Sequence, residues 1–242
     1  MEQWKDRVAV ITGASAGIGR SVAVALLEAG LIVVAIDERP DLLKNFAEFY
    51  SVSHSGRFHI RRCDVSDDDE TVAVFQWVER TLGGVDVLIN NASVEGSVSL
   101  LDGEVSEWRN LLDVNVVALN LCTREAVRSM RRRDAHGHII HINRYPSDPS
   151  HHFFGAARLL VKALTEGLRQ ELRDCGSHIR ITSISPGLVD DTSDSDRGLV
   201  EKPNFSDQNV PSAVLYVLKT PPRVQVQDII LKPSGETTCL PL

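Results

Sequence analysis

The chain has 242 residues, of which 43% are hydrophobic and 24% are charged, as in an ordinary globular protein. That length fits one α/β domain with a substantial core, so we expect residues 1–242 to form a single domain. The net charge of −7 argues against general nucleic-acid binding, because neutralising phosphates requires a positive surface.

The cysteines and the N-terminal residues indicate a reducing compartment. Cys63, Cys122, Cys175 and Cys239 are widely spaced and form no C-x-x-C pair, which predicts free thiols. The charged segment 1–7 leads directly into a predicted strand and lacks the pattern of a signal peptide. No apolar run approaches the ~20 residues that span a bilayer. We therefore expect a cytoplasmic protein without a membrane span.

Short apolar runs alternate with amphipathic segments along the chain, a pattern typical of a parallel sheet flanked by helices. The predicted strands cover residues 8–12, 32–36, 58–62, 85–90, 138–143, 179–184 and 228–231. The predicted helices cover residues 17–29, 41–50, 67–82, 104–132, 153–174 and 208–218. Ser66, followed by acidic residues at 67–70, predicts the capped start of the third helix. We predict an α/β fold with one Rossmann-type, doubly wound domain and a seven-stranded parallel sheet.

The first predicted strand ends in a glycine-rich turn that leads directly into a helix. Gly13, Gly17 and Gly19 allow a tight turn and a close approach of the backbone to a ligand. The amide groups at the start of the helix can then bind an anion such as a pyrophosphate. The spacing differs from G-x-G-x-x-G, but the order of strand, turn and helix supports a nucleotide site. The alternative is a turn that merely needs small residues, although one glycine would suffice for that.

Polar residues follow the next three predicted strands, at the edge where a ligand of such a sheet must lie. Asp37 stands about 20 residues after the glycines, where a carboxylate accepts hydrogen bonds from ribose hydroxyls. Its charge repels a 2′-phosphate and slightly favours NAD over NADP, a preference that the nearby Arg39 weakens. Asp64 follows the third strand and Asn91 follows the fourth. Together these residues indicate a dinucleotide.

With these motifs the chain resembles the classical short-chain dehydrogenase/reductases over nearly its full length. The motifs that carry the resemblance are residues 12–19, 63–65, 90–93, 114–116 and 186–187. Segments 1–7, 121–126 and 163–172 resemble the branch of insect farnesol dehydrogenases and vertebrate dehydrogenase/reductase member 11. The resemblance implies NAD(H) or NADP(H) as cofactor, with binding retained, weakened or lost. The implied contact residues are Gly13, Ser15, Gly17, Ile18, Gly19, Asp37, Asp64, Val65, Asn91, Ala92, Pro186 and Gly187.

Three of the four positions of the family's Asn-Ser-Tyr-Lys catalytic tetrad differ here. Asn115 is retained, and the resemblance implies that it holds a water and kinks its helix. The serine position is Arg144, and the Tyr-x-x-x-Lys pair is Phe154 and Arg158. In the family the tyrosine protonates the nascent alkoxide, while the lysine lowers the pKa of that tyrosine and binds the nicotinamide ribose. General acid catalysis of this kind is worth roughly 10²–10⁴-fold, and Phe154 has no proton to donate.

Arg144 and Arg158 place two cations in the former catalytic cleft. They would repel each other unless an anion or a carboxylate lies between them. The hypothesis that we favour is that they pair with nearby acids such as Asp190 or Asp191 and fill the site. The other hypothesis is that they bind an anionic or other small-molecule ligand.

Two short segments agree with a loss of activity. Arg144 and Phe154 are ten positions apart, closer than the family's serine and tyrosine usually are. The segment between Gly187 and the helix near Ala213 is also short, and its polar run at 190–196 would form a poor lid over a lipophilic pocket.

The sequence therefore predicts a nucleotide-binding protein with impaired catalysis that acts in binding, sensing or assembly. We expect a homodimer or homotetramer formed through helices 104–132 and 153–174, where the family dimerises. The alternative is an active NAD(P)-dependent oxidoreductase of isoprenoid or steroid-like alcohols and ketones, with His152 or Tyr145 as the proton donor. His138 and His141 face opposite sides of a strand, so no metal site is expected.

Overall fold

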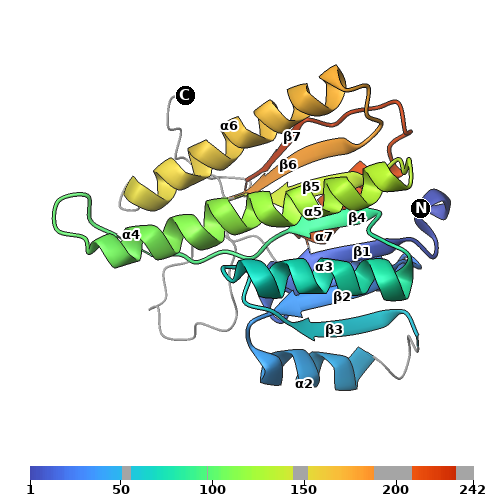
Figure 1. Cartoon of the computed structure of the whole chain (residues 1–242), viewed down its shortest axis with the longest axis horizontal. Coiled ribbons are helices and arrows are strands. Elements are labelled where there is room, and N and C mark those ends of the chain that lie inside the picture. The colour runs from blue at the N-terminus through green and yellow to red at the C-terminus, as the bar shows by residue number, and fades with distance from the viewer. Residues whose placement is uncertain (51–55, 97, 144–151, 188–208, 233–242) are drawn as a thin grey trace.

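Seven parallel strands form one sheet in the order β3-β2-β1-β4-β5-β6-β7 (Figure 1), which confirms the predicted fold class. The computed structural model describes residues 1–50, 56–96, 98–143, 152–187 and 209–232. The strands are β1 Val8–Thr12, β2 Ile32–Asp37, β3 Phe58–Arg62, β4 Val87–Asn90, β5 His138–Ile142, β6 Arg180–Pro186 and β7 Asp228–Leu231.

The helices are α1 Gly17–Glu28, α2 Pro40–Tyr50, α3 Asp68–Leu82, α4 Val105–Leu112, α5 Leu119–Arg132, α6 His152–Asp174 and α7 Asn209–Lys219. A short 3-10 turn, η1 Glu2–Trp4, precedes β1. The predicted helix 104–132 is three segments, because a π-helical turn, η2 Asp113–Ala118, separates α4 from α5. The other elements lie within a few residues of their predicted limits.

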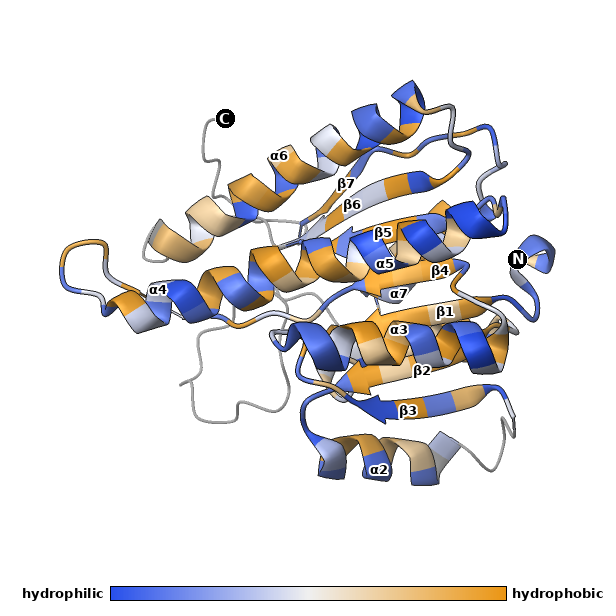
Figure 2. Cartoon of the chain, viewed as in Figure 1, coloured by the Kyte–Doolittle hydropathy of each residue, from blue (hydrophilic) through white to orange (hydrophobic). Residues whose placement is uncertain are grey.

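Two layers of helices cover the sheet because its central strands are apolar on both faces. In β1, Ala9 and Ile11 pack with α1 and α7, whereas Val8 and Val10 pack with α3 and α5. Figure 2 shows these strands as hydrophobic between helices that carry polar residues on their outer sides. In the part of the chain that the structure describes, no helix has both the length and the hydropathy needed to cross a membrane.

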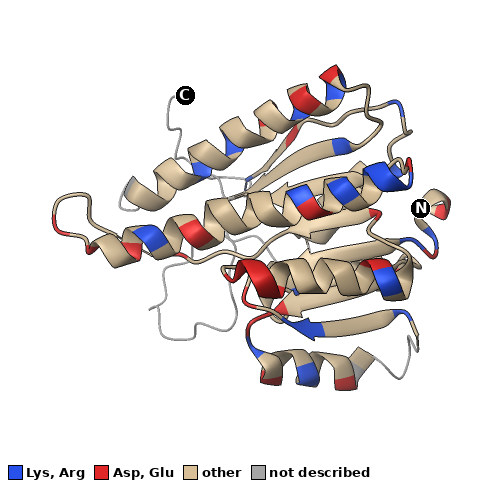
Figure 3. Cartoon of the chain, viewed as in Figure 1, with Lys and Arg blue, Asp and Glu red and all other residues tan. Residues whose placement is uncertain are grey.

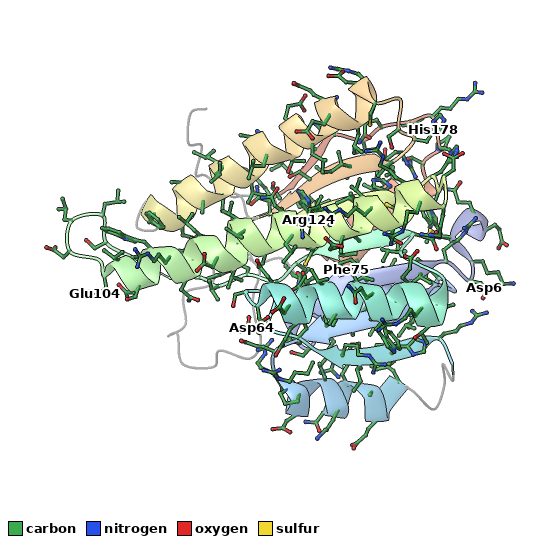
Figure 4. All side chains as sticks on the ribbon, in the orientation of Figure 1. Asp6, Asp64, Phe75, Glu104, Arg124 and His178 are labelled. Carbon is green, nitrogen blue, oxygen red and sulfur yellow. The ribbon has the colours of Figure 1, made fainter. Side chains whose placement is uncertain are left out.

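All seven strands end at the same edge of the sheet, because every neighbouring pair is parallel. At this carboxyl edge, on the left in Figure 1, α4 and the first turns of α6 project beyond the strands. Asp64 lies at this edge and His178 at the opposite end of the sheet (Figure 4). Ligands of doubly wound sheets bind at the carboxyl edge, so the candidate site is sought there.

Asp67 caps the start of α3. The predicted cap, Ser66, was wrong by one residue. The Asp67 carboxylate accepts a hydrogen bond from the amide of Glu70 (2.9 Å). The Ser66 hydroxyl instead donates to the Asp64 carboxylate (2.7 Å). The acidic side chains of the first turn gather at this helix end (Figure 3), where the dipole of the helix favours negative charge.

Both histidines of β5 are buried in the core, where their rings bond to threonines. His138 Nε2 lies 2.9 Å from Thr182 Oγ1. His141 Nδ1 lies 2.8 Å from Thr165 Oγ1, and its Nε2 lies 3.3 Å from Thr123 Oγ1. Burial lowers the pKa of both imidazoles to about 3, and the charges of Arg180 and Arg169 add to the effect. Both rings are therefore neutral in the folded chain at neutral pH.

These histidines make the stability of the chain depend on pH. The pKa of each imidazole returns to about 6.5 on unfolding, so the unfolded chain binds more protons below that pH. We expect the free energy of unfolding to be highest above about pH 6.5 and to fall towards pH 5, by on the order of 2 kcal/mol per histidine. Urea unfolding at a series of pH values between about 5 and 7 measures this free energy. A His141→Gln variant should show a shallower slope by about one proton, and an unchanged slope would contradict the assignment.

Candidate nucleotide and catalytic site

The glycine-rich turn after β1 packs so closely against the loop after β4 that side chains are excluded. A Cβ on Gly19 would lie 2.2 Å from the carbonyl oxygen of Gly13, and one on Gly13 would lie 2.8 Å from Ala92 Cα. Gly13 also has a φ of +64°, which L side chains rarely adopt. Of the residues predicted in this turn, Ser15 is buried, and Ile18 lies in the first turn of α1. The bare backbone at the start of α1 fits a pyrophosphate.

Asn91 and Thr12 fix this turn to the end of β4. The Asn91 side-chain amide donates to the carbonyl oxygens of Thr12 and Gly13, both at 3.0 Å. The Thr12 hydroxyl accepts hydrogen bonds from the backbone amides of Asn91 and Ala92. The Asn91 side chain, predicted as a cofactor contact, therefore braces the turn. Thr12 was named in the motif, but nothing in the sequence assigned it this role.

Asp37 and Arg39 form a two-pronged ion pair at the end of β2. The Arg39 guanidinium donates from Nε (2.9 Å) and from an Nη (3.1 Å) to the two carboxylate oxygens of Asp37. The amide of Ser15 donates to the same carboxylate (3.1 Å). Burial acts to raise the pKa of Asp37, but the hydrogen bonds from Arg39 and Ser15 outweigh it and the pKa lies below its usual value. The carboxylate is thus charged and partly neutralised by its neighbour.

A pocket of about 540 Å³ opens beside this pair, at the ends of β2 and β3. Its lining residues are Glu38, Arg39, Pro40, Asp41, Leu42, Arg62 and Asp64. Asp64 accepts hydrogen bonds from Ser66, and the adjacent Val65 is largely buried. Of the predicted contacts, Asp64 lines this pocket. Asp37 does not line it, but its ion-pair partner Arg39 does.

Asn115 lies in the π-helical turn η2, between α4 and α5. The turn widens the helix at this residue, which is 1% exposed. The Asn115 amide donates to the carbonyl of Val94 (2.8 Å), in the loop after β4. The retained member of the tetrad thus holds the loop after β4 against η2.

Phe154 is buried against apolar side chains at the start of α6. It is 5% exposed and packs with residues of α4, η2, α5 and α6, namely Leu111, Val116, Leu119, Ala157 and Val161. The guanidinium carbon of Arg158 lies 4.5 Å from the centre of the Phe154 ring, within range of a cation–π interaction. The Phe154 ring, which has no hydroxyl, therefore contacts the guanidinium of Arg158 one helical turn further on.

Arg158 connects α6 with two other elements. Its Nη2 donates to Ser93 Oγ in the loop after β4 and lies 3.4 Å from Asn115 Oδ1 in η2. The carbonyl of Arg158 accepts a hydrogen bond from the side-chain amide of Asn143 (3.2 Å), which follows β5. The residue is only 4% exposed although it carries a permanent charge. We call this set of contacts, Arg158 with Ser93, Asn115 and Phe154, the Arg158 bridge.

Of the remaining predicted site residues, the structure describes only some. Pro186 ends β6, and the amide of the following Gly187 donates to the carbonyl of Leu231 in β7 (2.8 Å). The tetrad position Arg144, the alternative donor Tyr145 and the acids Asp190 and Asp191 lie outside the described residues, as does the side chain of His152. Pairing between the arginines and these acids stays a prediction.

The structure adds Ser93 and Asn143 to the site. Ser93 belongs to the motif 90–93, but no local pattern pairs it with Arg158, which is 65 positions away in the chain. Asn143 had no signal, since it was the last residue of a predicted strand.

Known proteins share the sequence pattern of this chain. A family model described as short chain dehydrogenase matches residues 7–202. Dehydrogenase/reductase SDR family member 11 of Bos taurus is 42% identical over 255 residues, which cover 98% of this chain and all of that protein. Farnesol dehydrogenase of Aedes aegypti is 40% identical over 244 residues, covering 98% of this chain and 99% of that protein.

Solved structures share the fold. An alcohol dehydrogenase from the archaeon Thermococcus sibiricus, complexed with 5-hydroxy-NADP, superposes with a TM-score of 0.85 at 24% identity, covering 98% of this chain and 99% of that one. A metagenomic short-chain oxidoreductase in complex with NADP gives a TM-score of 0.82 at 24% identity, covering 96% of this chain and 99% of that one.

The packing of the turn predicts the effect of an added methyl group. Gly19→Ala should displace the Gly13 carbonyl or the Asn91 amide and lower the free energy of unfolding by about 1–3 kcal/mol. Gly167→Ala in α6 is the control, because its Cβ would meet nothing within 4 Å and alanine favours a helix. Thermal or urea unfolding compares the two variants. Equal free energies of unfolding for the two variants would show that the turn accommodates a methyl group at position 19 without loss of stability.

Proposed function

This chain belongs to the short-chain dehydrogenase family, and we propose that it retains the nucleotide site of that fold but not normal hydride transfer. The observation that carries the proposal is the buried, hydroxyl-free Phe154 with Arg158 stacked on its ring. In this reading the protein acts by binding, sensing or assembly.

The turn at the start of α1 supports the nucleotide part of the proposal. Gly13 and Gly19 let the turn pack against itself and against the loop after β4, where a Cβ would clash with the backbone. Helix α1 begins at Gly17, and the first amides of a helix have no acceptor within it, so they can bind an anion. Asp37 and Asp64 would lie near the adenosine, and Asn91 and Ala92 would lie behind the turn. A nicotinamide dinucleotide bound there would supply a hydride acceptor or donor.

The catalytic part of the proposal follows from proton chemistry. An alkoxide that forms during carbonyl reduction needs a proton donor within hydrogen-bond reach. Phe154 has none, and the guanidinium of Arg158 does not release its proton in proteins. Buried apolar side chains surround the ring. The expected loss is roughly 10²–10⁴-fold in turnover.

The test is a binding and turnover measurement on the purified chain. We expect NAD(H) or NADP(H) to raise the melting temperature or to change tryptophan fluorescence. We expect no change in reduced-nicotinamide absorbance with a panel of alcohols and ketones. Brisk turnover that survives His152→Ala and Tyr145→Phe would contradict the proposal, and turnover lost in either variant would support the substitute-donor alternative.

Restoring the tetrad tests the same reading in the other direction. The triple variant Arg144→Ser, Phe154→Tyr, Arg158→Lys supplies the polariser, the proton donor and the ribose-binding ammonium together. We expect turnover to rise by roughly 10²-fold or more over the wild type. The single variant Phe154→Tyr is the matched control, and it should gain little because Arg158 still occupies the face of the ring. Activity equal to wild type in a folded triple variant would show that the defect lies elsewhere.

We further propose a preference for NAD(H), set by Asp37 and moderated by Arg39. The ion pair places a guanidinium within reach of a 2′-phosphate and offsets the charge of the carboxylate. Arg39→Ala should therefore weaken NADP(H) and favour NAD(H), changing the ratio of the two Kd values roughly tenfold. Titration calorimetry measures both values. An unchanged ratio of the two Kd values would show that Arg39 does not influence the preference between NAD(H) and NADP(H).

The expected homo-oligomer remains a proposal, formed through α4–α5 and α6. Exposed apolar side chains on these helices support it, with Val117 51%, Leu159 60% and Leu160 42% exposed. Leu159→Glu should convert the oligomer to a smaller species in light scattering, because a charge would be buried in the interface. Tyr216→Glu, on the opposite layer in α7, is the control and should keep this interface. A monomeric wild type would contradict the proposal.

A further inference from the structure

We infer that the Arg158 bridge closes the nicotinamide end of the nucleotide groove, so that the chain recognises an adenosine diphosphate and gains nothing from the second nucleoside. The inference rests on the proposed nucleotide site and names the class of ligand that the site prefers. A protein of this kind would respond to adenine nucleotides in general and would not be selective for a redox cofactor.

The order of the strands places the two halves of a dinucleotide. The pyrophosphate would lie at the start of α1, after β1. Asp37 and the 540 Å³ pocket lie on one side of it, after β2 and β3. The second nucleoside must therefore extend the other way, over the ends of β4 and β5. In Figure 1, α5 lies over β4 and β5, and α6 runs beside β6.

The Arg158 bridge lies across this second half of the groove. Arg158 reaches from α6 to Ser93, which follows β4, and to Asn115 in η2. Asn143, at the end of β5, holds the backbone of Arg158 (3.2 Å). The residues on both sides of the place for the second ribose are thus bonded to one another. A ribose there would have to separate Arg158 from Ser93.

The chemistry of the bridge opposes that separation. The guanidinium has a fixed, planar set of donors, and three of its neighbours hold it: the Ser93 hydroxyl, the Asn115 oxygen and the Phe154 ring. Ribose hydroxyls could take the places of the Ser93 and Asn115 oxygens only after the hydrogen bonds of Nη2 to these two residues are broken. They would also have to move a largely buried cation from its aromatic support. Binding of the second nucleoside is therefore not favoured.

The adenosine end is built independently of this bridge. The pocket after β2 and β3 is lined by Arg39, Arg62 and Asp64 among others, and by none of the residues of the bridge. The glycine-rich turn is braced by Thr12 and Asn91. The diphosphate and the adenosine can consequently bind while the Arg158 bridge stays intact.

Calorimetric titration of the full chain with ADP, ADP-ribose and NAD⁺ tests the inference. We expect ADP to bind, and ADP-ribose and NAD⁺ to bind no more tightly than ADP. NAD⁺ binding roughly tenfold tighter than ADP would overturn the inference, because the second nucleoside would then contribute binding energy. If none of the three binds, the proposed nucleotide site fails as well, which separates that failure from a failure of the inference alone.

Variants of the bridge provide the second arm. Arg158→Ala and Ser93→Gly should each tighten NAD⁺ binding roughly tenfold while leaving the Kd for ADP unchanged. Arg173→Ala, at the far end of the same helix and exposed, is the matched control and should change neither Kd. Ser93→Gly alters no core residue, so it keeps the test valid if Arg158→Ala fails to fold. Weaker NAD⁺ binding in folded variants would show that Arg158 binds the ribose, and unchanged binding would show that the bridge does not oppose the second nucleoside; either result would overturn the inference.

Discussion

The guanidinium of Arg158 is the group around which this candidate site is arranged. It is almost completely buried, and a permanent charge in that position needs partners. Among the described residues, its partners include Ser93 after β4, Asn115 in η2 and the ring of Phe154 on α6. The end of β4, the π-helical turn η2 and the start of α6 are therefore joined through one side chain.

The substitutions at 154 and 158 are consistent with each other in this arrangement. A phenylalanine ring offers an unobstructed face to a cation, and the longer arginine reaches oxygens that belong to neighbouring elements. What the pair provides is a rigid connection. What it lacks is a titratable hydroxyl next to a base, which is the arrangement that proton transfer requires.

A series of buried side-chain hydrogen bonds connects the helices and strands that carry this site. Thr165 donates to the carbonyl of Val161, so its oxygen accepts from the Nδ1–H of His141. The His141 Nε2 then accepts from Thr123, whose oxygen accepts from the Asn90 amide (2.8 Å). This series links α6, β5, α5 and the end of β4 inside the core. Buried hydrogen bonds that connect several elements in this way favour one packing of those elements.

The sequence alone determined the sheet, because strand and helix periodicity are local properties of the chain. Each of these signals lies within a short segment of the chain, as do the apolar runs at 8–12 and 32–36 and the glycines after the first strand. The capping of α3 was predicted to within one residue, since Ser66 and Asp67 are both competent caps and only the geometry of the turn selects one. The absent hydroxyl at position 154 was likewise visible in the sequence.

The tertiary structure decided which partners the unusual residues take. Arg158 bonds to residues 65 and 43 positions away, and no local pattern encodes such pairs. Asn91 stays a predicted cofactor contact, and the structure adds that its side-chain amide braces the turn, because the carbonyls of Thr12 and Gly13 lie 3.0 Å from it once β1 and β4 are paired. Side-chain identity is local, whereas the choice among competing donors and acceptors depends on which strand ends the fold brings together.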